Sequence, residues 1–228
     1  MKTSIVVPLY NEEKRAGKFL GELLEFSKKN LDDYEIILVN DGSNDNTLGL
    51  IKKYESPEKV KIISYEINRG KGGALKEGFK AANGEKILFI DADGSIPPQE
   101  ITQMLEKLDE YDVVIGDRTS KESDVDTTII RKFTQISFNF IVNLLYNLRI
   151  SDTLCGFKGF KKNIGKKLFG ELISDRWIFD VEILYRAKKN NYKIFMLPIK
   201  WEHRSGSKIT ALGIIKMAFQ LLELRLKI

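Results

Sequence analysis

The chain has 228 residues, of which 43% are hydrophobic and 30% charged, a composition typical of a globular protein with a sizeable core. Its 37 basic and 32 acidic residues give a net charge of +5, which is too small to favour a nucleic-acid-binding protein. The one cysteine, Cys155, excludes an internal disulfide and suits a reducing cytosol.

Neither a signal peptide nor a membrane span is indicated by the pattern of apolar residues. Met1 is followed directly by a strand-like run, and no stretch of about twenty uncharged apolar residues occurs. We therefore expect one domain over residues 1–228, located in the cytoplasm and either soluble or peripheral to a membrane.

Short apolar runs alternate with amphipathic stretches through residues 1–118. The runs predict strands at Ser4–Pro8, Glu35–Asn40, Val60–Ser64, Lys86–Ile90 and Asp112–Gly116. Helical patterns lie between them: one places Phe19, Leu20, Leu23, Leu24 and Ser27 on a single face, and others cover Leu48–Tyr54, Gly73–Ala82 and Glu100–Leu108. This alternation predicts an α/β fold whose mostly parallel central sheet is flanked by helices, with ligands beyond the carboxyl ends of the strands.

Residues 119–228 carry two amphipathic helical patterns, about 129–148 and 211–228. In the first, the apolar face has Ile129, Phe133, Ile136, Phe140 and Leu144, and the polar face has Lys132, Gln135, Asn139, Asn143 and Asn147. Such helices need a partner, which is either a membrane interface or a second copy of the chain. The charged segment Thr119–Thr128 is expected to close over a bound ligand or, alternatively, to be a solvated surface loop.

Asp91 and Asp93 leave the core together, because they directly follow the apolar run Ile87–Ile90. Like charges placed this close are costly unless a cation neutralises them. Mg²⁺ and Mn²⁺ favour such oxygen ligands and also bind phosphate oxygens of a substrate. The alternative is a strand-to-loop cap in which Gly94 makes the turn.

Polar residues also follow the first two predicted strands. Tyr10 offers an aromatic face for a nucleobase, Glu12 a carboxylate for a ribose hydroxyl, and Asp41 an acceptor for base or ribose. In both places the alternative is that the residues begin the next helix.

The glycine-rich segment Asn68–Ala74 leads into a predicted helix, a place where backbone N–H groups often meet phosphate. Its spacing matches neither the phosphate-binding loop of ATPases nor the dinucleotide fingerprint of dehydrogenases. Both classes are therefore disfavoured.

Four segments in order, Ile5–Glu12, Val39–Ser43, Asn68–Gly72 and Asp91–Gly94, together resemble the family 2 glycosyltransferases of the GT-A fold. The resemblance implies that residues 1–118 bind a nucleotide-diphosphate sugar and residues 119–228 its acceptor. It implies a divalent cation, Mg²⁺ or Mn²⁺, held by Asp91 and Asp93. The residues it assigns to the nucleotide sugar are Pro8, Tyr10, Glu12, Val39, Asp41, Lys71, Asp91, Ala92 and Asp93.

Three later segments, Asp152–Lys158, Arg176–Glu182 and Trp201–Lys208, resemble the dolichyl-phosphate β-glucosyltransferase branch, which is close to dolichyl-phosphate mannose synthases. The resemblance implies inverting transfer of a hexose to dolichyl or polyprenyl phosphate by a protein peripheral on the cytoplasmic face of a membrane. Ser95 stands where the mannose synthases often carry glutamine. This difference favours a UDP-linked glucose or N-acetylhexosamine over GDP-mannose.

Cationic side chains are expected at the acceptor phosphate, with Arg118, Arg131, Arg204 and Lys208 as candidates; solvent is the alternative environment of Arg131. A lipid phosphate has a second pKa of about 6, so it is already an oxyanion and needs no histidine base. His203 is therefore expected to be a structural or lining residue. Asp93, Arg118 and Asp180 are the catalytic candidates, and the alternative for Asp180 is a helix cap shared with Glu182.

Four competing functions remain on the sequence alone. They are a GDP-mannose-dependent dolichyl-phosphate mannose synthase, a glycosyltransferase with a soluble glycan acceptor, a nucleotidyltransferase and a non-catalytic membrane-binding module. Loss of turnover on removing the Asp93 carboxylate would separate an enzyme from the last of these.

Overall fold

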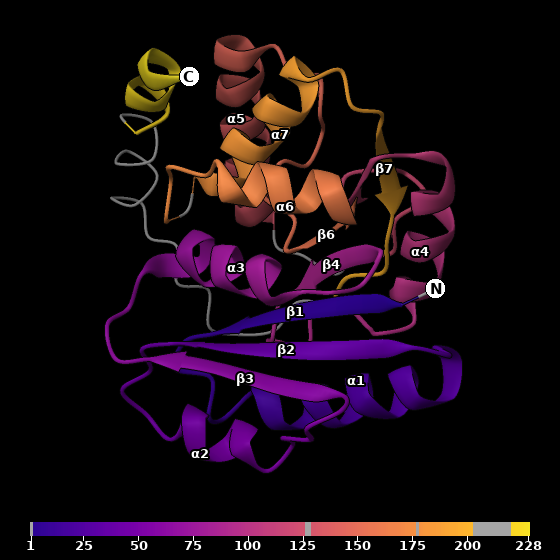
Figure 1. Ribbon diagram of the computed structural model, residues 1–228. Helices are drawn as coiled ribbons and strands as arrows, with labels where there is room; N and C mark the ends of the chain where they lie inside the picture. Colours follow the sequence, from indigo (N-terminus) through magenta and orange to yellow (C-terminus); the bar gives the residue numbers. More distant parts are fainter. Residues whose placement is uncertain (1, 126–128, 177, 203–219) are drawn as a thin grey trace.

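The computed structural model describes residues 2–125, 129–176, 178–202 and 220–228, with the backbone alone over residues 129–137. Figure 1 shows the elements in chain order, and residues 220–227 are helical as well. The elements are β1 (Thr3–Leu9), α1 (Ala16–Asn30), β2 (Tyr34–Asp41), α2 (Thr47–Lys52), β3 (Val60–Tyr65), α3 (Gly70–Ala81), β4 (Lys86–Ile90), α4 (Glu100–Glu110), β5 (Val113–Asp117), α5 (Ile129–Tyr146), β6 (Phe157–Lys161), α6 (Lys162–Gly170), α7 (Phe179–Lys189) and β7 (Ile194–Pro198).

The described strands form one sheet in the order β3-β2-β1-β4-β6-β5-β7. β1 runs parallel to β2 and β4, β2 to β3, and β5 to β7, whereas β6 is antiparallel to both its neighbours. The predicted α/β fold with a mostly parallel sheet is confirmed. β6 and β7 were not predicted, and through them the second half of the chain completes the sheet begun by the first.

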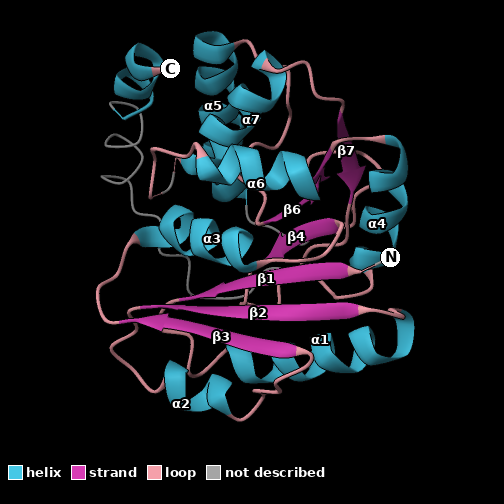
Figure 2. Ribbon diagram, viewed as in Figure 1, coloured by secondary structure: helices cyan, strands magenta, loops and turns pink. Residues whose placement is uncertain are grey.

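Helices cover both faces of this sheet, as Figure 2 shows for α1 and α3. On β6, Phe160 contacts the rings of Phe79 in α3 and Phe169 in α6. The preceding Gly159 faces Met104 and a leucine of α4 instead. Because successive strand residues point to opposite faces, α4 covers the face opposite to α3 and α6.

The polar face predicted for α5 is partly an interior face. Asn139 is buried, its amide donates to the carbonyl oxygen of Ser151, and its own carbonyl accepts from the Thr153 hydroxyl at 2.7 Å. Asn143 donates to the carbonyl oxygen of Ile150 at 3.0 Å. These asparagines do not need solvent as their partner, because their amides satisfy backbone groups of the loop between α5 and β6.

The apolar residues predicted to need a partner do remain exposed on this surface. Phe140 and Leu144 of α5 are 68% and 74% exposed, and Leu222 and Leu226 of the helix at 220–227 are 50% and 89% exposed. That helix packs beside α5 through the hydrogen bond from the Tyr146 hydroxyl to the Leu221 carbonyl oxygen, 2.5 Å. In the described part of the chain, no helix combines the length and apolarity that crossing a membrane requires.

Candidate active site

The loops after β1 and β2 are tied to each other at the carboxyl edge of the sheet. The Asn11 backbone N–H donates to Ser43 Oγ at 3.0 Å, and the Asn44 N–H donates to Asn11 Oδ1 at 2.8 Å. Asn11 has a φ of 53°, a left-handed conformation that asparagine tolerates better than most residues. β1 lies between β2 and β4, so the polar residues after these strands are brought to one edge.

Asp41, at the end of β2, holds the loop that follows β3. Its Oδ1 accepts hydrogen bonds from the Tyr65 hydroxyl and the Arg69 N–H, both at 2.8 Å, and its Oδ2 accepts one from Asn68 Nδ2, also at 2.8 Å. Burial raises the pKa of the Asp41 carboxyl, and the bonds from Arg69 and Tyr65 act against that rise. Asp41 does not begin a helix, because α2 starts only at Thr47.

The other residues predicted to contact the nucleoside lie close by. Pro8 of β1 is the register partner of Val39 in β2, and Tyr10 follows directly after β1. The Glu12 carboxylate is held by Arg15, with Arg15 Nε 2.8 Å from Oε2. Glu12 lies ahead of α1, which begins at Ala16, so its side chain belongs to the loop between β1 and α1.

Asp91, the first residue after β4, forms an ion pair with Lys71 of α3, with 2.5 Å between Lys71 Nζ and Asp91 Oδ1. Burial would lower the pKa of Lys71, but the carboxylates of Asp91 and Asp180 outweigh it and raise that pKa. Burial also raises the pKa of Asp91, with repulsion from Asp93 adding to the rise and Lys71 opposing it. Lys71 therefore places a positive charge beside Asp91, in addition to the divalent cation expected at Asp91 and Asp93.

Asp93 shows features of the alternative strand-to-loop cap. Its Oδ1 accepts a hydrogen bond from the Ser95 N–H at 2.9 Å, and Gly94 has a φ of 70°. These local bonds coexist with the charge coupling between Asp91 and Asp93. The turn that caps β4 therefore also carries the two aspartates predicted to bind the metal.

The donor set fits a divalent cation that arrives with a diphosphate. Among the described residues, no group of three or more His, Cys, Asp or Glu side chains gathers closely enough to hold a metal ion. Mg²⁺ is usually held by one or two carboxylates together with substrate phosphates and water. Asp91 and Asp93 match that pattern rather than a cage built from protein alone.

The glycine-rich segment forms the first turn of α3 and packs against the loop between α6 and α7. A Cβ added to Gly70 would stand 2.5 Å from the Asp175 carbonyl oxygen, and one at Gly72 2.6 Å from that of Ser174. The Gly73 N–H donates to the Asp175 carbonyl oxygen at 3.2 Å. The predicted start at Gly73 is therefore three residues late, and these glycines allow two backbone segments to approach.

Asp180, at the start of α7, joins the site through a residue that sequence reasoning did not single out. Lys158 of β6 donates to Asp180 Oδ1 at 2.5 Å and to the Cys155 carbonyl oxygen at 2.6 Å. The ammonium groups of Lys71 and Lys158 lie 5.6 Å and 5.5 Å from the centroid of the Phe89 ring. A lysine between the aromatic residues Phe157 and Phe160 was the signal available in the sequence.

Asp180 and Glu182 do not occupy the N-cap position of α7, which is Ile178; both lie within the first turn of the helix. Glu182 is fully buried and binds the preceding loop, accepting hydrogen bonds from the N–H groups of Ile173 at 3.0 Å and Ser174 at 2.9 Å. It also accepts from Arg186 Nε at 2.8 Å. Glu182 thus fixes the loop that lies on the glycines of α3, while Asp180 faces the site.

Arg118 is engaged by a second residue that was not predicted, Asp152. Arg118 Nε and Nη2 donate to the two oxygens of Asp152 at 2.7 Å and 2.8 Å, and the guanidinium lies 5.8 Å from the ring of Trp201. Burial would raise the pKa of Asp152, but the Arg118 charge and hydrogen bonds lower it below its usual range. Asp152 begins one of the segments that resemble the dolichyl-phosphate β-glucosyltransferases, but its pairing with Arg118 depends on the fold.

Several predicted residues are not placed. Arg204, Lys208 and His203 lie outside the described residues, as does most of the predicted helix at 211–228. Arg131 falls where the backbone of α5 alone is described. In the segment Thr119–Thr128, residues 119–122 form bends and a turn, Val125 forms an isolated bridge with Trp201, and Asp117 Oδ1 accepts the Thr119 N–H at 2.8 Å.

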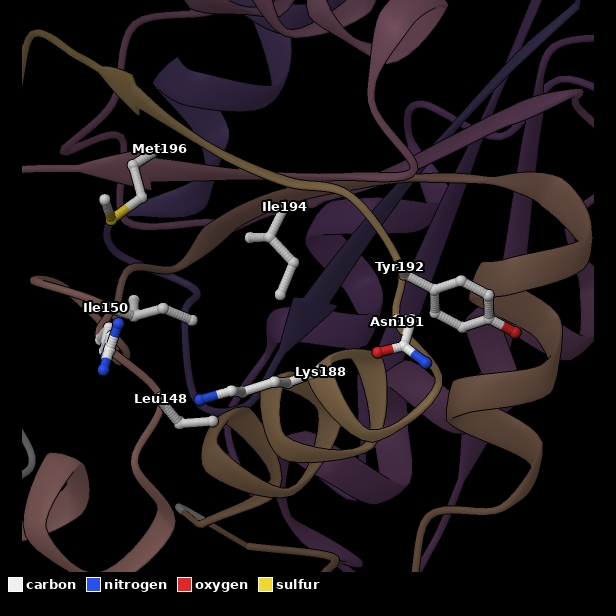
Figure 3. A pocket seen from close by; sticks show the side chains of 8 residues that line it. Leu148, Ile150, Lys188, Asn191, Tyr192, Ile194 and Met196 are labelled. Atoms are coloured by element: carbon white, nitrogen blue, oxygen red, sulfur yellow. The ribbon is translucent and has the colours of Figure 1, made fainter.

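A cavity of about 460 Å³ lies elsewhere, at the edge of the sheet formed by β7. Figure 3 shows Lys188 of α7 and Asn191 of the turn after it on one side of the cavity, with Ile194 and Met196 of β7 opposite. It is lined by Leu148, Arg149, Ile150, Lys188, Asn191, Tyr192, Ile194 and Met196. None of the predicted site residues whose side chains the structure describes lines it, so the convergent charges rather than this cavity mark the site.

Solved structures resemble this fold over nearly its whole length. Glucosyl-3-phosphoglycerate synthase from Mycobacterium tuberculosis, crystallised with Mn²⁺, UDP and glucosyl-3-phosphoglycerate, has a TM-score of 0.74 at 16% identity, covering 98% of this chain and 79% of that one. S. aureus TarS 1-349 with UDP-GlcNAc has a TM-score of 0.64 at 21% identity, covering 99% and 66%. At such identities the likeness shows the fold alone, which is GT-A.

Sequence relatives are more specific. Dolichyl-phosphate beta-glucosyltransferase of Drosophila melanogaster is 36% identical over 228 aligned residues, covering 92% of this chain and 70% of the relative. The Homo sapiens protein of that name is 35% identical over 242, covering 98% and 75%. Residues 4–169 match the family model described as Glycosyl transferase family 2. The chain therefore belongs to glycosyl transferase family 2 and is a hexosyltransferase.

Proposed function

We propose that this enzyme transfers glucose, with inversion, from UDP-glucose to dolichyl phosphate or a related polyprenyl phosphate. The observation that carries the proposal is the convergence of the ion pairs Lys71–Asp91 and Lys158–Asp180 beside the Phe89 ring, with Asp93 following Asp91 at the end of β4. The names of the relatives support glucose and dolichyl phosphate. The UDP and Mn²⁺ crystallised with glucosyl-3-phosphoglycerate synthase support a UDP-linked donor and Mn²⁺ here.

In this proposal the donor lies across the ends of β1, β2 and β4. The nucleoside is held by Pro8, Tyr10, Glu12, Val39 and Asp41, and the diphosphate lies by Lys71, Asp91, Ala92 and Asp93. When bound to Asp91 and Asp93, Mg²⁺ or Mn²⁺ supplies positive charge against the negative charge that builds on the departing diphosphate. Lys71 adds a second positive charge beside Asp91.

The acceptor approaches from the second half of the chain. Asp152 occupies Nε and Nη2 of Arg118, which leaves Nη1 as the atom we assign to the lipid phosphate. Arg131, Arg204 and Lys208 are proposed for the same phosphate. Because a phosphate monoester is an oxyanion at neutral pH, the attacking oxygen needs no proton acceptor, and Asp180 is free for another role.

Membrane association at the cytoplasmic face follows from the exposed apolar side chains. Phe140 and Leu144 on α5, with Leu222 and Leu226 on the neighbouring helix, form a surface suited to the headgroup boundary of a bilayer. Dimerisation through these side chains is the competing use of the surface. A peripheral position would bring the strand ends to a phosphate at the bilayer surface.

The purified protein should be incubated with radiolabelled UDP-glucose, Mn²⁺ and dolichyl phosphate in detergent or vesicles. We expect chloroform-extractable label whose glucose is released by a β-glucosidase. Parallel reactions with UDP-N-acetylglucosamine, GDP-mannose and soluble glycans test the donor and the acceptor. Transfer from GDP-mannose alone would reassign the donor, transfer only to soluble glycans would remove the lipid acceptor, and no transfer from any donor would reject the proposal.

A further inference from the structure

Lys158 is a fully buried cation at the centre of the sheet. It lies on β6 directly opposite Phe89 of β4, and its side chain has no exposed surface. Among the described residues, its ammonium contacts the Asp180 carboxylate and the Cys155 carbonyl oxygen, as given above. A buried ammonium is retained at such a position only when a carboxylate pairs with it.

This pair adjoins the donor site instead of standing apart from it. Lys71 and Lys158 lie at similar distances from the ring of Phe89, and each holds one aspartate. The charge of Asp180 acts on both Lys71 and Asp91. The Asp180 side chain keeps 6% of its surface exposed, so the carboxylate borders the site while Lys158 lies entirely beneath it.

We propose that Lys158 is a positioning residue for Asp180. By holding Oδ1 it fixes the carboxylate and cancels its charge, so that the remaining oxygen accepts a hydrogen bond from a hydroxyl of the donor sugar. This inference rests on the proposed function, because the donor sugar is the ligand to be positioned. No covalent step or proton transfer is assigned to either residue.

Charge cancellation matters because both substrates are anionic. A nucleotide diphosphate and a phosphate monoester must approach within reach of one anomeric carbon, and an unpaired carboxylate beside them would repel both. A neutral acceptor such as an amide would avoid this repulsion but would bind a hydroxyl less strongly than a charged group does. The buried Lys158–Asp180 pair offers a charged hydrogen-bond acceptor while carrying almost no net charge.

The test compares Lys158→Met, Lys158→Arg, Asp180→Asn and the double variant Lys158→Met/Asp180→Asn. Lys161→Met is the matched control, because Lys161 is on the same strand and pairs with Asp112 away from the site. For each variant, kcat and KM for UDP-glucose, their pH profiles and the thermal unfolding midpoint are measured. Calorimetric binding of UDP-glucose with Mn²⁺, which requires no acceptor, is measured in parallel.

We expect Lys158→Met to lose at least about tenfold in kcat/KM and in affinity for UDP-glucose, since it leaves Asp180 unpaired. Lys158→Arg should recover part of this loss. The double variant should have a higher kcat/KM and a higher affinity for UDP-glucose than Lys158→Met, because it has no unpaired charge at this position. Lys161→Met should have the kcat/KM and affinity of the wild type.

Three results would overturn the inference. In the first, folded Lys158→Met keeps wild-type kcat/KM and UDP-glucose affinity, so the pair serves stability alone. In the second, the double variant has no higher kcat/KM or UDP-glucose affinity than Lys158→Met. In the third, Asp180→Asn abolishes turnover and removes an acidic limb from the pH profile, which would make Asp180 a base. If wild-type protein binds UDP-glucose but labels no lipid, the proposed acceptor fails while calorimetry still decides the role of Lys158.

Discussion

Lys71 of α3 and Asp91 after β4 meet with 2.5 Å between Nζ and Oδ1. The contact joins the glycine-rich segment to the acidic turn, so that segment contributes a side chain to the site. Its glycines serve the packing of the loop at Ser174 and Asp175. Lys71 is therefore expected to affect ligand binding, whereas the neighbouring glycines are expected to affect stability.

Lys71→Met should weaken UDP-glucose binding by roughly tenfold to a hundredfold, because a charged contact contributes about 1.5–3 kcal/mol. Calorimetry in the presence of Mn²⁺ measures this. Lys80→Met, an exposed lysine on the same helix, is the control and should bind like wild type. Equal affinities for the two variants would remove Lys71 from the donor site.

Gly72→Ala should destabilise the protein by about 1–3 kcal/mol, because an added Cβ would crowd the Ser174 carbonyl oxygen and the loop could relieve this only by moving. Urea unfolding measures the change. Gly21→Ala is the control, since a Cβ there meets nothing within 4 Å, and alanine favours a helix over glycine by about 0.5–1 kcal/mol. If both variants were equally stable, the close packing at Gly72 would be refuted.

Asp93→Asn should retain the fold, because its amide oxygen can still accept the Ser95 N–H, while turnover falls by about a hundredfold or more. Electron paramagnetic resonance should show weaker Mn²⁺ binding in the presence of UDP. Asp109→Asn, which alters an exposed ion pair with Lys86, is the control. Unchanged Mn²⁺ binding in the Asp93 variant would argue against a metal ligand at this position.

Phe140→Ser combined with Leu144→Ser should reduce binding to phosphatidylcholine–phosphatidylserine vesicles by about tenfold or more, since each buried apolar side chain contributes roughly 1.5–3 kcal/mol. Sedimentation with vesicles measures the bound fraction. Ile67→Ser is a matched control, because Ile67 is 78% exposed but lies on the loop after β3. Loss of a dimer in place of vesicle binding would assign the surface to self-association.

Glu35 should make stability depend on acid pH. Burial opposes its ionisation, but hydrogen bonds from Lys61 and Ser4 hold its pKa at about 2, below the ordinary value of about 4.5 for a glutamate. The group binds fewer protons when folded, so its contribution is present above pH 4.5 and is lost as pH falls towards about 2. The ionised Glu35 carboxylate thus contributes about 3 kcal/mol to the free energy of unfolding at neutral pH.

Urea unfolding between pH 7 and pH 3 checks this prediction. Glu35→Gln should flatten the fall in stability over that range, because it removes the titrating group. Glu58→Gln, at an exposed position, should leave the slope as in wild type. An unchanged slope in the Glu35 variant would show that other carboxyls carry the acid dependence.

Much of the first half could be predicted from local pattern. Ile87–Ile90 is too apolar for anything but a buried strand, and the aspartates after it fall at a strand end by necessity. Lys158 and Asp152 could not be assigned this way. β6 lies far along the chain from β4 but pairs beside it, so the charge inside the strand finds its partner only through a long-range contact.

Asparagines 139 and 143 illustrate the same limit within one helix. Periodicity places them on a polar face, yet their amides are needed by the loop at residues 150–153, which only the folded chain brings beneath α5.

The strand and helix alternation of the first half, the acidic turn at Asp91–Asp93 and the resemblance to the family could all be predicted from the sequence, because each depends on residues that are close in the chain. Only the folded chain shows that Lys71 pairs with Asp91 and Lys158 with Asp180, that both ammonium groups lie near the Phe89 ring, and that Asp152 pairs with Arg118. These pairings join segments that are distant in the chain. A charge that the packing shields from water must be paired, and the packing in three dimensions decides which residue is its partner.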